Sequence, residues 1–147
     1  MNTKNYFDQL AAKWDNMVYH DKEKINRILD YANLKTGDVV LDVGTGTGVM
    51  IRFILERVKD TGKIVAVDIS ENMIQIARGK YTQKNVNFIC DDVSNLEYDS
   101  FFDAIVCYSV FPHFEEKEKI IKKFYTMLKM GGKLIICHSQ SREIINN

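Results

Sequence analysis

The sequence predicts an α/β domain built on a doubly wound, mainly parallel sheet, and three observations lead to this prediction. Short apolar runs alternate with helical stretches, a glycine cluster follows the first run, and turn signals separate the units. Continuously apolar strands are typical of sheets that are buried on both faces, and strands that alternate with helices form parallel sheets. We therefore expect helices on both sides of a five-stranded sheet.

Length and composition favour one globular domain. The chain has 147 residues, of which 46% are hydrophobic and 27% are charged. We expect a single domain with a helical cap over residues 1–35, an α/β core over 36–138 and a tail over 139–147. Twenty basic residues balance twenty acidic ones, so no nucleic-acid partner is expected, because such binding favours a basic excess.

Several other classes of protein are also disfavoured. The polar N-terminus, MNTKNYFDQL, does not resemble a signal peptide, and the longest clean apolar run is far shorter than the about 18 residues of a membrane span. The three cysteines lie in apolar runs without metal-ligand spacing, so we expect buried, metal-free thiols in a cytoplasmic protein: Cys90, Cys107 and Cys137.

Two helices are predicted before the sheet begins. In the first, apolar and aromatic residues recur at helical spacing: Tyr6, Phe7, Leu10, Ala11, Trp14 and Val18. The second covers residues 22–33 and places its apolar residues on one side: Ile25, Ile28, Leu29 and Ala32. Thr36-Gly37-Asp38 then signals a turn.

The first three strands follow at regular spacing. Residues 39–43 form an apolar run, and after the glycine cluster a helix is predicted over 49–58. Thr61-Gly62 turns the chain into a second strand over 64–67. Ser70 is a suitable N-cap for a helix that runs through Arg78, and the third strand covers 86–90.

The last part of the pattern contains two more strands. Residues 104–108 form the fourth strand. A helix over 115–129 would direct four apolar residues inward: Ile120, Ile121, Phe124 and Leu128. Gly131-Gly132 is expected to end this helix before the fifth strand, residues 134–137.

The glycine cluster carries the first functional signal. Gly44, Gly46 and Gly48 alternate between a strand and a helix, where the backbone can turn tightly and a ligand can approach closely. Gly48 lies two residues after Gly46, whereas the dinucleotide fingerprint GxGxxG requires three, and the P-loop Lys-Ser/Thr pair is absent. Asp42 precedes the loop, and the loop has no basic residue. The charge of Asp42 would therefore repel a bound pyrophosphate.

Acidic residues follow the second and third strands. Asp68 lies twenty residues after Gly48, where a carboxylate can accept hydrogen bonds from ribose hydroxyls. Asp91 and Asp92 follow the third strand, where an acid can accept a bond from the exocyclic amine of adenine or can simply form a turn. Since the carboxyl ends of parallel strands meet at one edge, these acids predict a ribosyl ligand there.

Five segments, taken together, resemble the class I S-adenosylmethionine-dependent methyltransferases, and in particular the group that includes ubiquinone/menaquinone-biosynthesis methyltransferases. In chain order they are VLDVGTGTG, VDISENMIQIAR, DDVSNL, FDAIVCYSVFPHF and LKMGGKLII. The resemblance covers residues 39–136. It implies a Rossmann-like fold that binds S-adenosylmethionine, transfers its methyl group to a small-molecule acceptor and releases S-adenosylhomocysteine.

The resemblance also implies roles for single residues. Those expected around the methionine part are Asp42, Gly44, Thr45, Gly46 and Gly48. Asp68 would hold the ribose, while Ile69, Met73, Asp92 and Val93 would meet the adenine. Tyr108 would lie near the methyl-transfer position. His113, which follows the fourth strand, is the first candidate for a general base, although a histidine there can equally pack against or cap the next helix. His20 and His138 are weaker candidates.

The N-terminal and C-terminal segments leave alternatives open. The aromatic N-terminal helix would either cap the cofactor and acceptor or simply pack on the core. Members of the family that this sequence resembles continue into a further helix and an antiparallel strand pair. The tail over residues 139–147 is too short to supply them. The fifth strand would then be an exposed edge, which predicts a homodimer or a strand exchange.

Two other functions remain as alternatives to methyl transfer. The short C-terminus is compatible with a non-catalytic or truncated S-adenosylmethionine-binding module. An NAD-dependent oxidoreductase is disfavoured by the glycine spacing. The segment after the fourth strand lacks the Asn/Asp-Pro-Pro-aromatic tetrapeptide of the related enzymes that act on nucleic acid or protein glutamine. A small, partly apolar acceptor is therefore preferred.

Overall fold

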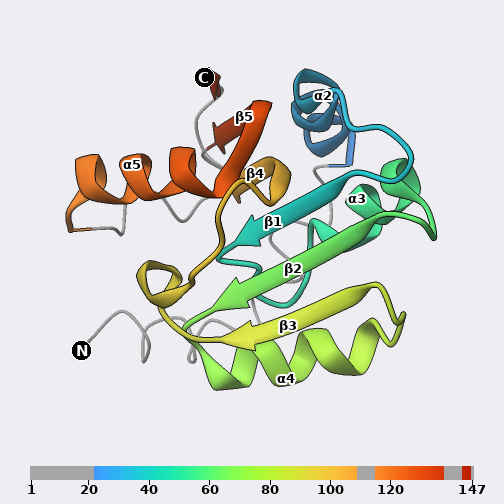
Figure 1. Ribbon diagram of the computed structural model, residues 1–147. Coiled ribbons are helices and arrows are strands. Elements are labelled where there is room, and N and C mark those ends of the chain that lie inside the picture. Colours follow the sequence, from blue (N-terminus) through green and yellow to red (C-terminus); the bar gives the residue numbers. More distant parts are fainter. Residues whose placement is uncertain (1–21, 109–114, 138–143, 147) are drawn as a thin grey trace.

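The computed structural model of the chain describes residues 22–108, 115–137 and 144–146. Within these residues six strands form one sheet in the order β3-β2-β1-β4-β5-β6 (Figure 1). Strands β1 to β5 are parallel, and β6 runs antiparallel to β5. The predicted doubly wound, mainly parallel sheet is confirmed, with β1 at its interior.

The elements have the following bounds. The strands are β1 Val39–Val43, β2 Lys63–Asp68, β3 Val86–Cys90, β4 Phe102–Tyr108, β5 Leu128–Cys137 and β6 Ile144–Asn146. The helices are α2 Lys22–Ala32, α3 Ile51–Val58, α4 Glu71–Lys80, α5 Lys117–Met127 and the 3-10 turn η1 Val93–Asn95. In the part of the chain that the structure describes, no helix is long and apolar enough to cross a membrane.

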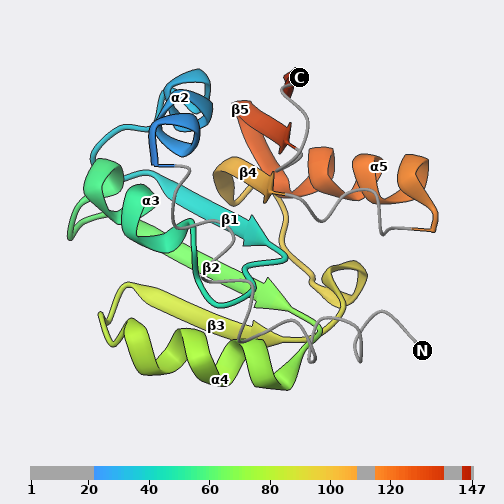
Figure 2. The same ribbon diagram turned by 180° about the vertical axis from the view of Figure 1, so that it is seen from behind.

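One face of the sheet is covered by α2 and α3 (Figure 2). Side chains alternate between the two faces of a strand, so every second residue of β1, β2 and β4 joins this core. The predicted inward residues of α2 are buried as expected: Ile25, Ile28, Leu29 and Ala32. The helix α4 packs against β2 and β3 and therefore covers the outer strands of the sheet.

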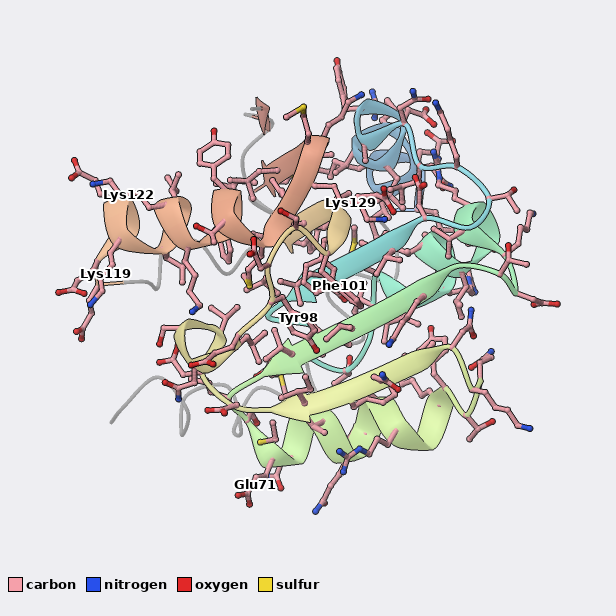
Figure 3. All side chains as sticks on the ribbon, in the orientation of Figure 1. Glu71, Tyr98, Phe101, Lys119, Lys122 and Lys129 are labelled. Carbon is pink, nitrogen blue, oxygen red and sulfur yellow. The ribbon has the colours of Figure 1, made fainter. Side chains whose placement is uncertain are left out.

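The other face is covered in two different ways. Over β4 and β5 it packs against α5, through Ile120, Phe124 and Met127. The connection after β3 also joins this core and contributes Val93, Leu96 and two aromatic rings. Those rings, Tyr98 and Phe101, stack with centroids 5.0 Å apart and lie side by side in Figure 3.

The start of α4 follows the predicted capping pattern. Ser70 has extended backbone angles, and its hydroxyl accepts a 3.3 Å hydrogen bond from the N–H of Met73. Glu71 lies in the first turn, while Arg78 and Lys80 lie in the last, so both ends complement the helix dipole. The N-cap that the sequence predicted is confirmed.

The end of α5 differs from the prediction. The helix ends at Met127 and not at residue 129, and Gly131-Gly132 lies inside β5. Hydrogen bonds to the connection before β4 explain the early end, because the N–H of Phe101 donates to the carbonyl of Met127 at 2.9 Å. Leu128 then pairs with Phe102, the register shifts, and regular pairing resumes at Lys133.

The prediction that the fifth strand has a free edge is wrong. Ile144–Asn146 form β6, which pairs with Ile135–Cys137 of β5. The three residues of β6 cover the last three residues of β5, at its carboxyl end. The predicted homodimer stays a prediction, because β6 pairs with only these three residues of β5.

One cysteine also departs from the prediction. Cys107 and Cys137 are buried in the sheet, whereas Cys90 is exposed. Cys90 is exposed because it lies on β3, an edge strand of the sheet. Only the first residue of this strand is buried, and the others are partly or fully exposed. An apolar run of five residues does not by itself distinguish an edge strand from a central one.

Gly132→Ala is expected to destabilise the protein. A Cβ there would lie 2.9 Å from the carbonyl oxygen of Lys129 and 3.1 Å from that of Phe102, which are backbone atoms that cannot move freely. We expect a loss of about 1–3 kcal/mol in the free energy of unfolding, measured by urea titration. The matched control is Gly79→Ala in α4, where a Cβ meets nothing within 4 Å, and this change should stabilise by about 0.4–1 kcal/mol. Equal midpoints for the two variants would contradict the packing described for the β5 bulge.

Candidate functional site

The register of the sheet brings the acidic residues of β1 and β2 together. Asp42 pairs with Ala66 of β2 and with Val106 of β4, so these three side chains share one face. Asp68 and Tyr108 lie two residues beyond Ala66 and Val106, and the period of two places them on the same face. Asp42, Asp68 and Tyr108 therefore gather at the carboxyl edge, on the side covered by α2 and α3.

The glycine loop between β1 and α3 has the backbone conformation that its sequence requires. Gly44, Gly46 and Gly48 have φ angles of 70°, 59° and 90°, in the left-handed region that side chains disfavour. A Cβ on Gly48 would also approach the ring of Tyr81 to 3.0 Å. The helix that follows begins at Ile51, two residues later than predicted, because the loop itself occupies residues 44–50.

Asp68 connects the glycine loop to the start of α4. Its Oδ2 accepts a 2.8 Å bond from the N–H of Gly46, and its Oδ1 accepts a 2.9 Å bond from the N–H of Ser70. Its exposed fraction is 7%. Each carboxylate oxygen can accept more than one hydrogen bond, so these contacts are compatible with the predicted role of Asp68 toward ribose hydroxyls.

Asp42 is more deeply buried, with an exposed fraction of 1%. The hydroxyl of Thr45 donates a 2.7 Å hydrogen bond to its Oδ2. Its Oδ1 is buried without a hydrogen-bond partner among the described residues. A buried carboxylate oxygen without a partner is costly, and such groups commonly mark functional sites.

Burial changes the protonation of this part of the site. Burial raises the pKa of Asp42 from its ordinary value of 3.8 to about 7; the Thr45 hydrogen bond lowers it, and the nearby charge of Asp68 raises it. Burial also raises the pKa of Cys107 well above its ordinary value, and Asp42 adds to that effect. Cys107 is therefore a neutral thiol at neutral pH and is poorly suited to be a nucleophile.

The loop after β3 forms the third part of the site. The N–H of Asp91 donates to the carbonyl of Asp68 at 3.0 Å, which holds the loop beside β2. Asp92 caps η1, because its Oδ1 accepts bonds from the N–H and the hydroxyl of Ser94 at 2.9 and 2.8 Å. The turn-forming role that the sequence left open is present, while the predicted contact of Asp92 with adenine stays a prediction.

Asp91 has the turn-forming role that the sequence left open for the acids after the third strand. Its Oδ1 accepts bonds from the N–H of Asp92 at 2.7 Å and from the side-chain amide of Asn95 at 2.9 Å. The spacing Asp-x-x-x-Asn is a local signal that could have indicated this turn. Asp91 thus shapes the loop that presents Asp92.

The other predicted site residues differ in accessibility. Ile69 is half-buried, whereas Met73, Val93 and Tyr108 are at least nine-tenths buried. Ile69 is thus better placed than Met73 to contact a ligand directly. His113 lies outside the described residues, as do His20, His138 and the aromatic residues of the N-terminal segment. Among the described residues no group of three or more His, Cys, Asp or Glu is arranged to hold a metal ion.

The arrangement suits a ligand that carries both a cation and neutral hydroxyls. The glycine loop offers close backbone approach, and no residue between Gly44 and Met50 is basic. Asp42 offers a buried carboxylate oxygen that a cationic group could satisfy. Asp68 offers a carboxylate that is already oriented by two backbone bonds. Together these groups can bind and orient a ligand.

Comparisons with known proteins agree with this geometry. A family described as "Methyltransferase domain" matches residues 40–132. The chain is 31% identical over 131 residues to the malonyl-[acyl-carrier protein] O-methyltransferase of Acetivibrio thermocellus, which covers 88% of this chain and 46% of that protein. It is 29% identical over 143 residues to the ubiquinone/menaquinone biosynthesis C-methyltransferase of Hydrogenovibrio crunogenus, covering 90% and 56%.

Solved structures show the same fold. The crystal structure of a SAM-dependent methyltransferase from Aquifex aeolicus superposes with a TM-score of 0.78 at 26% identity, over 88% of this chain and 71% of that one. The chain spans about half the length of the two curated relatives it matches. The match over residues 40–132 includes the glycine loop, Asp68 and Asp92.

Asp42→Asn is expected to stabilise the ligand-free protein at pH 8 more than at pH 5. The folded protein retains a proton on Asp42 from its ordinary pKa of 3.8 up to about 7, whereas the unfolded chain has lost it. Wild-type stability therefore falls, relative to the variant, as pH rises through this window. The thermal midpoint of the variant relative to wild type should be at least about 3 °C higher at pH 8 than at pH 5. The exposed Asp60→Asn serves as control, and an equal shift at both pH values would contradict the buried carboxyl.

Proposed function

Because this chain belongs to the methyltransferase domain family, in the class I group that uses S-adenosylmethionine, we propose that it binds this cofactor at the carboxyl edge of the sheet and transfers the methyl group to a small-molecule acceptor. The observation that carries the proposal is the buried Oδ1 of Asp42, which has no hydrogen-bond partner among the described residues and lies beside a glycine loop without basic residues. A cationic methionine moiety would satisfy that oxygen, whereas the pyrophosphate of a dinucleotide would be repelled by it.

Three acidic residues would hold the cofactor. Asp42 would face the methionine part, together with Gly44, Gly46 and Gly48, whose missing side chains let a ligand approach the backbone. Asp68 would accept bonds from the ribose hydroxyls, since it is already oriented by Gly46 and Ser70. Asp92 and Val93 would meet the adenine, and the half-buried Ile69 would pack beside it.

The residues of the site would act mainly by positioning. When bound, the cofactor supplies a sulfonium whose methyl group is transferred by in-line displacement and whose thioether leaves as S-adenosylhomocysteine. The protein would hold the methyl donor in one orientation and exclude water, which are the largest contributions to a displacement of this type. Asp68 contributes orientation through its two backbone bonds, and the buried Asp42 would contribute a negative charge once it is ionised beside the ligand cation.

We propose a small, partly apolar acceptor and no nucleic-acid partner. The relatives named above are an O-methyltransferase and a C-methyltransferase, so a shared donor site serves different acceptor atoms in this family. The balance of twenty basic and twenty acidic residues favours a small molecule over a polyanion. A cofactor-binding module without turnover is the alternative, and formation of S-adenosylhomocysteine with a panel of small acids, thioesters and phenols separates the two.

Calorimetric titration tests the cofactor. We expect S-adenosylmethionine and S-adenosylhomocysteine to bind and NAD not to bind. Asp68→Asn should weaken binding at least about 10-fold, because a hydrogen bond to a charged group contributes about 1.5–3 kcal/mol. The exposed Asp60→Asn should bind like wild type, and circular dichroism should show both variants folded. Binding of NAD alone, or of none of the three ligands, would overturn the proposal.

A further inference from the structure

Thr45 holds one oxygen of the Asp42 carboxyl through a buried side-chain hydrogen bond. Thr45 is 3% exposed, and its N–H is fixed by a 3.0 Å bond to the carbonyl of Val67. Its hydroxyl has a single proton, which it donates to Oδ2 of Asp42 at 2.7 Å. This bond fixes the carboxyl plane and reserves Oδ1, the oxygen without a described partner, for a ligand.

We propose that Thr45 is a positioning residue that couples cofactor binding to the ionisation of Asp42, so that the site accepts the ammonium group of its ligand as Asp42 gives up a proton. This inference rests on the proposed function and deepens it. The exchange is balanced, because one proton leaves the carboxyl for solvent while one cationic ammonium takes its place beside the carboxylate.

The surroundings of Asp42 make such an exchange physically reasonable. Among the described residues, the titratable groups near it are Asp68 on β2 and Tyr108 on β4, which share its face of the sheet, and Cys107 on the opposite face of β4. The loop over residues 44–50 carries none. Among the described residues no basic side chain forms an ion pair with it. A carboxylate that is buried beside another acid and lacks a cation is held back from ionising, and a ligand cation supplies the missing charge.

The Thr45 bond works in the opposite direction to burial. A hydroxyl that donates to a carboxylate stabilises its ionised form, and this bond lowers the pKa of Asp42, which burial has raised to about 7. Without the bond, Asp42 would ionise only at higher pH. Thr45 therefore sets the pH above which the site is ready for a cation.

The predicted pH dependence has a definite sign. Below the pKa of Asp42 the ligand must displace a proton, so its affinity should rise about tenfold per pH unit and then level off. The α-amino group of the ligand itself loses its proton at still higher pH, and affinity should decline there. The decline in affinity at high pH arises from the ligand and is common to every protein variant. Only the rise in affinity at low pH, here called the acidic limb, therefore reports on the site.

The experiment is a calorimetric titration of the full chain with S-adenosylhomocysteine from pH 5.5 to pH 8.5. Thr45→Val should move the acidic limb up by about one pH unit, because one lost hydrogen bond to a charged group corresponds to about that shift. Its affinity should thus fall about tenfold at pH 6.5 and much less at pH 8.5. Thr45→Ser, which keeps the hydroxyl, should restore the wild-type profile.

Two controls separate this role from a merely structural one. Thr126→Val changes an exposed threonine on α5 and should leave the profile unchanged. 5′-Methylthioadenosine keeps the adenine, ribose and thioether but lacks the ammonium, so its weaker binding should show no acidic limb. Wild-type titrations at pH 6.5 in two buffers of different ionisation enthalpy should show release of roughly three-quarters of a proton per ligand bound, the fraction of Asp42 that is protonated at that pH.

The other possible results of these titrations would overturn the inference. If Thr45→Val loses the same affinity at every pH, or if 5′-methylthioadenosine shows the same acidic limb, the inference is overturned. Binding of S-adenosylhomocysteine with a flat pH profile would overturn the inference and leave the proposed function standing. If S-adenosylhomocysteine does not bind at any pH, the proposed function fails and the inference fails with it.

Discussion

The two hydrogen bonds accepted by the Asp68 carboxylate determine the shape of the candidate site. One comes from Gly46 in the loop after β1, and the other comes from Ser70 at the start of α4. Ser70 in turn caps that helix, so a single side chain joins two loops and one helix end. The carbonyl of Asp68 also accepts the N–H of Asp91, which brings in the loop after β3. Three segments that are separate in the sequence therefore meet around one residue of β2.

Asp42 differs from Asp68, because its burial lowers the stability of the protein while it prepares the site for a ligand. Asp68 is buried and well bonded, whereas Asp42 is buried with one oxygen that no described residue satisfies. A buried acid of this kind lowers the stability of the protein as pH rises from 3.8, the ordinary pKa of the acid, to about 7, and it prepares the site for a positive charge. Local destabilisation of this sort is common at functional sites, where the surrounding fold maintains an arrangement that would not form alone.

The sequence predicted the parts of the fold that depend on local pattern. The strand over residues 86–90 and the N-cap at Ser70 are as expected, because apolar runs and capping residues act over a few neighbours. The predictions that failed depend on partners distant in sequence. Leu128 fits a helix by its periodicity but pairs with Phe102 of β4, and β6 is too short to be recognised before its pairing with β5 is known. For the site, the acids could be named from the sequence, but the Thr45 bond to Asp42 could not, since burial and rotamer are tertiary properties.

The order of the strands divides the chain into two halves with different freedom to evolve. The residues assigned to the donor pocket, from Asp42 to Val93, come from β1, β2, β3 and the turns that follow them, on one side of the sheet. Strands β4, β5 and β6 and the helix α5 lie on the other side. Because β4 pairs directly with β1 and places Val106 and Tyr108 on the face of Asp42, changes in β4 reach the donor site. Substitutions, insertions or added segments in β5, β6 and α5 are separated from β1 in the strand order by β4. Such a division would let descendants of one ancestral domain acquire new acceptors while inheriting the donor site intact.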